Sequence, residues 1–386
     1  MTGAGRRRIR GATEVQTTSQ STIPIAAPLL TDDDKRRVLE VLDSGHLVAG
    51  RWVRQFERAF SAYLGAVHGA ATSSGSAALE VAFQAAGIGP GARVVTTPFS
   101  FVSSANAILR CGAVPVFADI DPRTFNLDPA SVEDLVVRTP GTRAILAVHL
   151  YGLPCAMNAL MDLAHRHRLV VIEDAAQAHG ATFRGRKVGT FGAVGAFSFY
   201  PSKNLTTGEG GMAVTDDAGL AKRAGMLVNV GQSSTYTYEL LGSNNRMTEM
   251  AAAIGIGQLA GLDERNAMRR HNAARLTAGL RDLDWLVLPH EPADCVHVYH
   301  QYTLRVPRAR DRLARHLADC GIGTRVYYPT PIHHSPLYRR LGYGEARCPQ
   351  AEHAAAEVLS IPVHPAVGAQ GIQRIVEAIG GFDPRH

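Results

Sequence analysis

The stretch FSFYPSKNLTTGEGG (residues 197–211) places a lysine, Lys203, between an aromatic run and a glycine-rich turn. The chain has 40 basic residues, of which four are lysines and the remaining 36 arginines. A lysine amine can lose its proton and act as a nucleophile, whereas a guanidinium stays charged. A lysine at this position therefore indicates covalent or proton-transfer chemistry.

A second stretch, TSSGSAALEVAF (72–83), is a turn of small residues that runs into a helix. Gly75 allows close backbone approach, Ser76 supplies a hydroxyl, and the free N–H groups around Ala77 favour an anion such as phosphate. A helix that is simply capped by serine explains the same pattern. The stretch also resembles a hydrolase nucleophile elbow, but no Asp–His pair stands out downstream, so we set a hydrolase aside.

A third stretch, LVVIEDAAQAHGA (169–181), ends a buried strand with two carboxylates, Glu173 and Asp174. Ligands bind at the carboxyl ends of parallel strands, and a buried carboxylate is costly unless a cation compensates its charge. A protonated pyridine nitrogen is one such cation. Alternatively, Asp174 caps a following helix, and the two roles do not exclude each other.

Two other patterns are set aside. GEGGMA (208–213) spells a dinucleotide fingerprint, but a strand-like run follows it instead of a helix, so we expect no NAD site. His290, Cys295, His297 and His300 could suggest zinc. Because the last two lie three apart on a predicted strand, they point to opposite faces, and we expect no metal.

One cofactor accounts for the three stretches together. A phosphate cradle (Gly75–Ala77), an acid for a pyridinium (Asp174) and a lysine able to form a Schiff base (Lys203) describe pyridoxal 5′-phosphate. Each signal alone is weak, and their order and shared sheet-edge location make the combination specific. We predict that Lys203 holds the cofactor as an internal aldimine and later moves protons.

The composition is that of a folded globular protein, with 46% hydrophobic and 19% charged residues in a chain of 386. The length predicts two domains, a large one at 25–260 and a small one at 261–386, after a disordered basic leader at 1–24. The net charge of +6 comes from scattered arginines. The only basic run, RRRIR (6–10), has no interleaved aromatic residues, so we expect no nucleic-acid binding.

The cysteines and the hydropathy pattern indicate location. Five cysteines, an odd number without a CxxC pair, are typical of free thiols in a reducing cytoplasm. The leader has no apolar h-region, and no run approaches about 18 consecutive apolar residues. We therefore expect a cytoplasmic protein that is neither secreted nor membrane-spanning.

The elements that must position these residues follow from hydrophobic periodicity. Buried strands are predicted at 93–97, 114–118, 144–149 and 169–174, and helices between them at 102–112, 131–138 and 156–168. This alternation predicts an α/β fold with a mostly parallel sheet flanked by helices.

Further elements are predicted on both sides of this core. Thr31 and Gly45 bound a capped helix before it. After it we expect one long helix at 249–283 and then a smaller α+β domain. That domain should contain a strand at 296–306 and helices near 308–321, 350–359 and 369–380.

In these motifs the chain resembles the nucleotide-sugar aminotransferases of the DegT group, which are fold-type I pyridoxal phosphate enzymes. The resemblance runs from about residue 25 to the C-terminus. It rests on SGSAAL, PFSFVSSANAI, VHLYG, EDAAQAHGA, FSFYPSKNLTTGEGG and GSNNRMTEM, in the family's order.

The resemblance implies a role for each matching position around the cofactor ring. Lys203 matches the Schiff-base lysine, and Asp174 matches the partner of the pyridine nitrogen. Gln177 matches the residue near the ring hydroxyl, and Phe101 the aromatic residue that stacks on the ring.

The resemblance also implies the phosphate contacts. Ser76, Ala77 and Ser198 match them, with serine at 76 where the family usually has threonine. Asn244 matches an asparagine that reaches the phosphate from the other subunit, which implies a homodimer with shared active sites. Val230 stands where the family commonly has a histidine, so this position cannot perform any role that the histidine has in the family.

The implied reaction is a two-half ping-pong transfer. An amino donor, expected to be L-glutamate, gives up its amine, and a nucleotide-linked keto sugar takes it. Arg325, Tyr327, Tyr328, His333 and His334 are the candidates for the acceptor pocket, although the two histidines are equally explained by a proline-rich loop. The Ala- and Arg-rich composition is typical of GC-rich bacteria, where amino sugars of antibiotics are common.

Other functions remain open at this point. With the same cofactor, the chain could be a lyase, a desulfurase or an aminotransferase of keto-cyclitols, although no cysteine is marked as a desulfurase nucleophile. Lys203 argues against the dehydratase branch of the family, which has histidine there. A non-catalytic regulatory protein on the same fold is the alternative of another class, and the intact Lys203, Asp174 and Gln177 argue against it.

Overall fold

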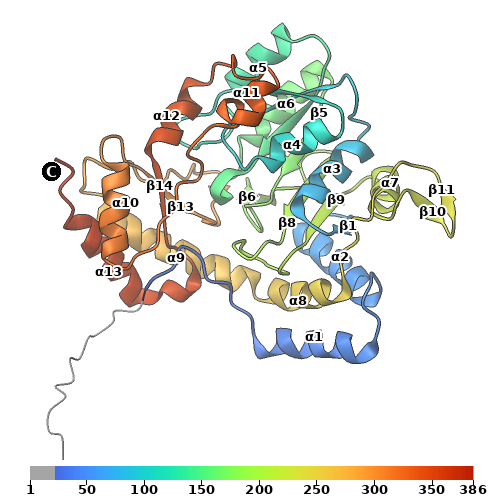
Figure 1. Cartoon of the computed structure of the whole chain (residues 1–386), viewed down its shortest axis with the longest axis horizontal. Coiled ribbons are helices and arrows are strands. Elements are labelled where there is room, and N and C mark those ends of the chain that lie inside the picture. Colours follow the sequence, from blue (N-terminus) through green and yellow to red (C-terminus); the bar gives the residue numbers. More distant parts are fainter. Residues whose placement is uncertain (1–21, 386) are drawn as a thin grey trace, which may run out of the picture.

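The computed structural model describes residues 22–385, and its centre is a seven-stranded sheet (Figure 1). The strand order is β1-β9-β8-β5-β4-β2-β3, and of these seven only β9 runs against the others. The predicted mostly parallel sheet and its four predicted strands are confirmed. The strands are β1 (His68–Thr72), β2 (Arg93–Thr96), β3 (Val114–Phe117), β4 (Thr142–Val148), β5 (Val170–Asp174), β8 (Val194–Ser198) and β9 (Gly211–Thr215).

Helices cover both faces of the sheet because alternate strand residues point to opposite sides. In β4, for example, Leu146 packs in one apolar cluster and Ile145 in the other. One face is covered by α3 (Gly75–Ala85), α4 (Ser103–Arg110) and α7 (Ala218–Val228). The other is covered by α2 (Arg51–Leu64), α5 (Pro129–Arg138), α6 (Met157–His167) and α8 (Glu249–Ala260).

The capped helix near the N-terminus is confirmed as α1 (Asp32–Ser44). The Thr31 hydroxyl accepts from the Asp34 N–H, the Asp34 carboxylate accepts from the Thr31 N–H, and Gly45 closes the helix with φ 67°. The next helix, α2, was not assigned from the sequence. The Glu249 carboxylate stabilises its start by accepting from the backbone of Gly50 and Val53.

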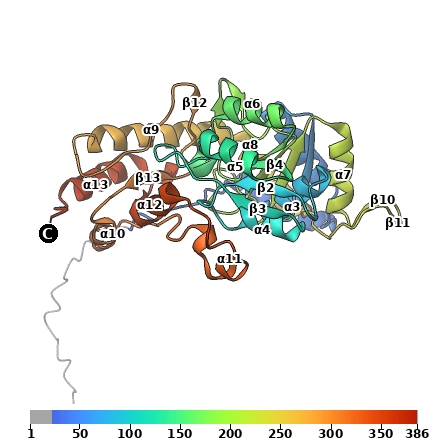
Figure 2. The ribbon, with the colours of Figure 1, turned by 90° about the horizontal axis from the view of Figure 1, so that it is seen from above.

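The expected single helix at 249–283 is wrong. The chain forms α8 and then α9 (Leu262–Leu280), interrupted at Gly261, whose φ of −103° and ψ of 11° leave the helical range. Glycine is a poor helix former, and here it separates two helices that pack against different parts of the molecule (Figures 1 and 2).

The expected strand at 296–306 is also wrong, because the chain is extended only at its two ends, β12 (Cys295–Val296) and β13 (Tyr302–Arg305). Between them Tyr299 has φ 43°, a left-handed conformation that breaks a strand. His297 and His300 are therefore not on opposite faces of one strand. Both are buried in an irregular segment.

The C-terminal part has its own apolar core of helices around a two-stranded antiparallel sheet (Figure 2). The partner of β13 is β14 (Val358–Ile361), which begins where the predicted helix at 350–359 was expected to continue. The helices α9, α10 (Arg310–Asp319) and α13 (Gly368–Gly380) pack in this core, whereas α11 (Pro336–Arg340) and α12 (Pro349–Glu357) pack in another cluster with Phe99 and Phe117.

The first described residues join this C-terminal core, since buried Ile23 forms a parallel bridge with Ile322. Most of the predicted leader, residues 1–21, lies outside the described residues, and the domain boundary at 260–261 remains a prediction. In residues 22–385 no helix is both long and apolar enough to span a membrane. The remaining short elements are β6 (Thr182–Phe183), β7 (Arg186–Lys187), β10 (Gln232–Ser234), β11 (Thr237–Tyr238), η1 (Leu150–Gly152), η2 (Ile332–His334) and η3 (Pro365–Val367).

Candidate functional site

The candidate site lies at the carboxyl edge of the parallel strands, where β5 ends in Asp174. The carboxylate accepts a hydrogen bond from the Ser104 hydroxyl at 2.7 Å and another from the Ala176 N–H at 3.2 Å. Burial raises the pKa of Asp174, and these two bonds and the Lys203 charge oppose the rise. No helix follows Asp174, so the helix-capping alternative does not hold.

The neighbouring carboxylate, Glu173, points to the other face of the sheet. It accepts hydrogen bonds from the N–H groups of Gly189 and Gly192, both at 2.7 Å, and it lies 3.0 Å from His149 Nε2. His149 Nδ1 in turn accepts from the Cys155 N–H. Glu173 therefore ties together three segments beneath the sheet edge and does not face the site.

Lys203 lies in the loop that connects β8 to β9, in a turn in which its N–H donates to the Tyr200 carbonyl. Burial lowers the pKa of Lys203 to about 8, and the negative charge of Asp174 opposes this shift. Near neutral pH a fraction of this amine is therefore unprotonated and able to act as a nucleophile.

The start of α3 is packed tightly against the ends of β8 and β9. A Cβ on Gly75 would lie 2.5 Å from Ser198 Cβ, and a Cβ on Gly211 would lie 2.4 Å from the Ser74 carbonyl oxygen. Only glycine allows this approach. It places the Ser198 end of β8 beside the positive end of the helix dipole, as a phosphate cradle requires.

The polar groups of this cradle are partly engaged with each other. The Ser74 hydroxyl caps α3 by accepting from the Ala77 N–H at 3.2 Å. The Ser76 hydroxyl donates to Ser103 at the start of α4, at 2.8 Å. Two helix starts therefore meet here, each with a serine hydroxyl.

Gln177 is held in one orientation beside the site. Its side-chain oxygen accepts from the Tyr151 N–H at 2.7 Å, and its amide nitrogen donates to the Tyr328 hydroxyl at 3.1 Å. The Tyr328 ring lies 6.3 Å from the Phe101 ring, which is 55% exposed. Gln177, which we assigned to the cofactor, and Tyr328, which we assigned to the acceptor pocket, thus make direct contact.

The other acceptor candidates are dispersed. The Tyr327 carbonyl accepts from the Tyr151 hydroxyl, which places it next to the site. Arg325 is exposed, and its backbone pairs with Ser360. His333 and His334 lie in η2 and face Glu352 of α12.

Asn244 is exposed and follows the β10–β11 hairpin, which projects from the body beside α7 (Figures 1 and 2). It forms an antiparallel bridge with Asn229. Its role toward the phosphate of another subunit remains a prediction. Val230, the departure from the family pattern, has φ 51° at the base of the same hairpin.

Sequence reasoning missed Ser104, Tyr151 and His149. Ser104 is 70 residues from the carboxylate that it contacts, and Tyr151 acts on Gln177 through its backbone. The serine-rich helix start and the VHLYG stretch were noticed only as family motifs. No local pattern specifies these partners.

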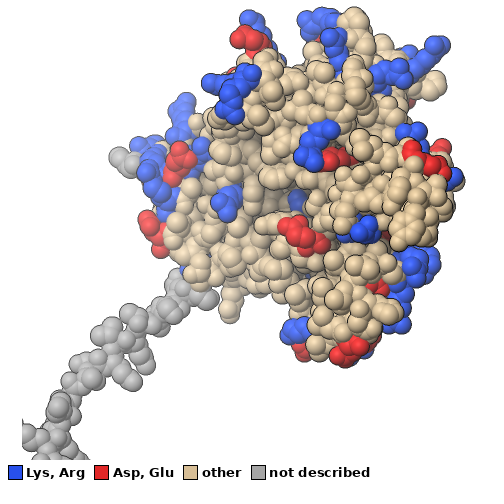
Figure 3. Space-filling model, turned by 45° about the vertical axis from the view of Figure 1, so that its right-hand side comes forward, with Lys and Arg blue, Asp and Glu red and all other residues tan. Residues whose placement is uncertain are grey.

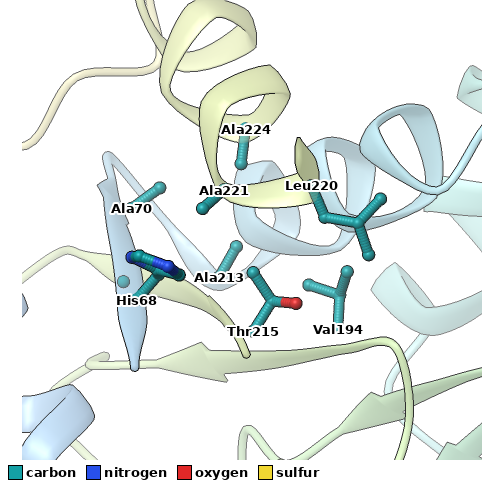
Figure 4. A pocket seen from close by; sticks show the side chains of 9 residues that line it. His68, Ala70, Val194, Ala213, Thr215, Leu220, Ala221 and Ala224 are labelled. Carbon is teal, nitrogen blue, oxygen red and sulfur yellow. The ribbon is translucent and has the colours of Figure 1, made fainter. Parts of the chain in front are cut away.

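Two further surface features of residues 22–385 differ from this site. On the face shown in Figure 3, Lys and Arg are scattered among Asp and Glu rather than gathered in a single patch. A shallow hollow between α7 and the β1–β9 edge is lined mainly by alanine, valine and leucine, with His68 and Thr215 as its polar side chains (Figure 4). It contains none of the residues described above.

Comparison with known proteins gives matches over nearly the whole chain. The profile of the DegT/DnrJ/EryC1/StrS aminotransferase family matches residues 28–380. Over 350 residues the chain is 45% identical to a "Pleiotropic regulatory protein" of Geobacillus stearothermophilus, covering 90% of this chain and 93% of that protein.

Two further matches come from Streptomyces venezuelae. The chain is 42% identical over 343 residues to the dTDP-3-amino-3,4,6-trideoxy-alpha-D-glucose transaminase, covering 89% of this chain and 90% of that protein. The crystal structure of S. venezuelae DesV in complex with a ketimine intermediate superposes with a TM-score of 0.88 at 40% identity, covering 93% and 98% of the two chains.

Proposed function

The chain belongs to the DegT/DnrJ/EryC1/StrS aminotransferase family, and on that premise we propose that it moves an amino group from L-glutamate to a nucleotide-linked keto sugar. The resemblance inferred from the sequence is confirmed, and the protein is a pyridoxal phosphate-dependent sugar aminotransferase. The observation that carries the proposal is a lysine of lowered pKa beside a buried carboxylate at the carboxyl edge of the sheet.

The residues of the site fit pyridoxal phosphate. Gly75 and Gly211 let the end of β8 and the start of β9 pack closely against the start of α3, where the helix dipole favours a phosphate. Asp174 is a buried carboxylate whose raised pKa reflects a charge without full compensation, as a partner of a pyridinium nitrogen needs. Lys203 offers an amine whose pKa of about 8 leaves a fraction unprotonated near neutral pH.

Pyridoxal phosphate, when bound, supplies an aldehyde that condenses with amines and a ring that takes up the electron pair left at the donor's α-carbon. Lys203 is the amine that would hold it. When free, the same Nζ would take the donor's α-proton, because a pKa of about 8 lets the amine exchange a proton near neutral pH. The second half-reaction uses the same proton transfer in reverse.

Asp174 keeps a proton on the ring nitrogen by remaining ionised. The Ser104 hydroxyl and the Ala176 N–H both donate to it and so favour the charged form against burial. Tyr151 and Tyr328 fix the orientation of Gln177, which would contact the ring hydroxyl. Phe101 is exposed and available to stack on the ring.

The acceptor pocket is proposed around Tyr327 and Tyr328. Tyr327 contacts Tyr151 and Tyr328 contacts Gln177, which are both next to the proposed cofactor site. Arg325 is proposed to meet the charged part of the nucleotide sugar, and His333 and His334 to border the pocket. The cytoplasmic location remains a prediction.

The proposed active unit is a homodimer in which Asn244 reaches the partner's phosphate site. The projecting β10–β11 hairpin supports this arrangement, because its turn exposes Tyr236 and the segment that follows β11 exposes Leu241, the latter 95% exposed. Apolar side chains on a projecting element are typical of a surface covered by another chain.

The decisive experiment is an absorption spectrum of the purified protein with pyridoxal phosphate, followed by addition of L-glutamate. We expect a visible band that glutamate bleaches and that nucleotide-linked keto sugars restore. Borohydride reduction and peptide mapping should place the cofactor on Lys203. A keto-cyclitol tested in parallel distinguishes the second class of acceptor.

A regulatory function is the second candidate, since the relative that is 45% identical carries a regulatory name. A protein of that kind would give no band, or a band that glutamate does not change. The label on another lysine would equally contradict the proposed function.

A further inference from the structure

A group of three potential metal ligands includes the two histidines proposed to border the acceptor pocket. His333 and His334 of η2 and Glu352 of α12 bring their ligand atoms within 4.8 Å of one another, and this is the one such group of three in residues 22–385. His333 Nε2 lies 3.5 Å and His334 Nε2 lies 3.8 Å from the same carboxylate oxygen, Glu352 Oε1.

These separations are long for hydrogen bonds. A hydrogen bond from an imidazole nitrogen to a carboxylate is usually about 2.7–3.2 Å long. Tetrahedral zinc with ligands at about 2.1 Å holds neighbouring ligand atoms about 3.4 Å apart. The distances from Glu352 Oε1 to the two imidazole nitrogens therefore resemble the separation between two ligands of one zinc ion more than the length of a hydrogen bond.

The ligand atoms are also of the right kind and are held by the fold. Two imidazole nitrogens and one carboxylate oxygen suit zinc and similar divalent ions and leave a fourth position for water. His333 is buried, and its ring lies 6.0 Å from that of Phe117. The Ile332 N–H donates to the Pro98 carbonyl, which fixes η2 against the large sheet.

Glu352 is positioned from the other side. It lies in the first turn of α12, whose start is held by the Asp119 carboxylate accepting from the N–H groups of Gln350 and Ala351, both at 2.9 Å. His334 and Glu352 are 26% and 39% exposed, so an ion can enter from solvent.

We propose that His333, His334 and Glu352 form a binding site for a divalent transition-metal ion of the zinc type, which links η2 to α12. The proposal departs from our expectation of no metal, which concerned other histidines. Because η2 follows Tyr327 and Tyr328 in the chain, an ion here restrains the segment that carries them. The ion is proposed to supply no group to the amino transfer, so its binding can be measured without turnover.

The test is zinc binding to the holoenzyme after dialysis against a chelator, measured by competition with a chromophoric zinc indicator. We expect one tight equivalent per chain, with affinity at least about tenfold lower in His334→Ala and in Glu352→Gln. Both variants change partly exposed side chains, so folding should survive. His46→Ala, at an exposed histidine far along the chain from the group, is the matched control and should bind like wild type.

Cobalt provides an independent readout. Tetrahedral coordination with nitrogen and oxygen ligands should give visible d–d bands in wild type that disappear in His334→Ala. Equal zinc affinity in wild type and both site variants, or no binding to wild type, would overturn the proposal.

Discussion

Glu173 and Asp174 are adjacent residues of β5 with the same charge and nearly equal burial, 0% and 6% exposed, yet their surroundings differ. Glu173 has two backbone N–H donors at 2.7 Å and His149 at 3.0 Å. Asp174 has one short bond from Ser104 and a longer one from Ala176, and its pKa is raised.

The difference shows that two adjacent residues at a sheet edge can have different roles, one structural and one chemical. Because strand side chains alternate, Glu173 faces the loops beneath the sheet and Asp174 faces α4 and Lys203. A buried carboxylate with enough donors holds segments together. A buried carboxylate with fewer donors, such as Asp174, can instead pair with a cation that a ligand brings.

The largest expected effect is at Lys203. Lys203→Ala should lower transaminase turnover by at least about 10⁴-fold, because the amine that holds the cofactor and moves the proton is gone. Stopped-flow absorbance with glutamate measures it. Lys222→Ala, at an exposed lysine of α7, is the control and should keep wild-type turnover; substantial activity in Lys203→Ala contradicts the assignment.

Exchanging the two carboxylates for amides sharpens the comparison most directly. Asp174→Asn should reduce turnover by about 10³-fold with little loss of stability, since a buried charge is removed. Glu173→Gln should keep most activity per folded molecule but lower the free energy of unfolding by about 3 kcal/mol. The amide oxygen can accept from only one of the two glycine N–H groups, and the NH₂ group would face the other donor.

Turnover together with urea unfolding measures both quantities for each variant. If the two variants lost activity and stability in the same proportion, the distinction between a structural and a chemical carboxylate would be wrong.

The pH dependence of cofactor capture tests the link between Asp174 and Lys203. With the pKa of Lys203 lowered to about 8, the capture rate by apoprotein should rise about tenfold per pH unit below 8 and level off above it. The Asp174 charge raises the pKa of Lys203, so Asp174→Asn should move this midpoint to lower pH. Glu173→Gln should leave it in place; a shift of equal size there would break the comparison.

The smallest expected effect is at Ser104. Ser104→Ala removes a donor to the Asp174 carboxylate, so the pKa of Asp174 rises further and turnover falls by about tenfold. Because activity needs the ionised carboxylate, the acid limb of the pH–rate profile should move to higher pH. Ser104→Thr retains a hydroxyl and should restore the wild-type limb, which a purely steric effect of the alanine would not explain.

Parts of the fold were predictable for local reasons. Continuous apolar runs specified β2 to β5, and the Thr31 and Gly45 signals bounded α1. The break at Gly261 and the left-handed Tyr299 were missed, because a single residue can end an element without changing the surrounding periodicity. The helix expected at 350–359 is present as α12, but it ends at Glu357 because β14 begins at Val358, and its partner β13 lies more than 50 residues earlier.

The sequence by itself determined the reactive groups, since Lys203, Asp174 and the glycine at 75 carry their chemistry in any fold that brings them to one edge. It also determined the family, because the motifs recur in order. Only the tertiary structure decided which of two adjacent carboxylates faces Lys203, that Ser104 supports Asp174, and that two histidines of η2 face Glu352. These contacts join residues far apart in the chain, and their energies depend on burial and geometry that no local pattern encodes.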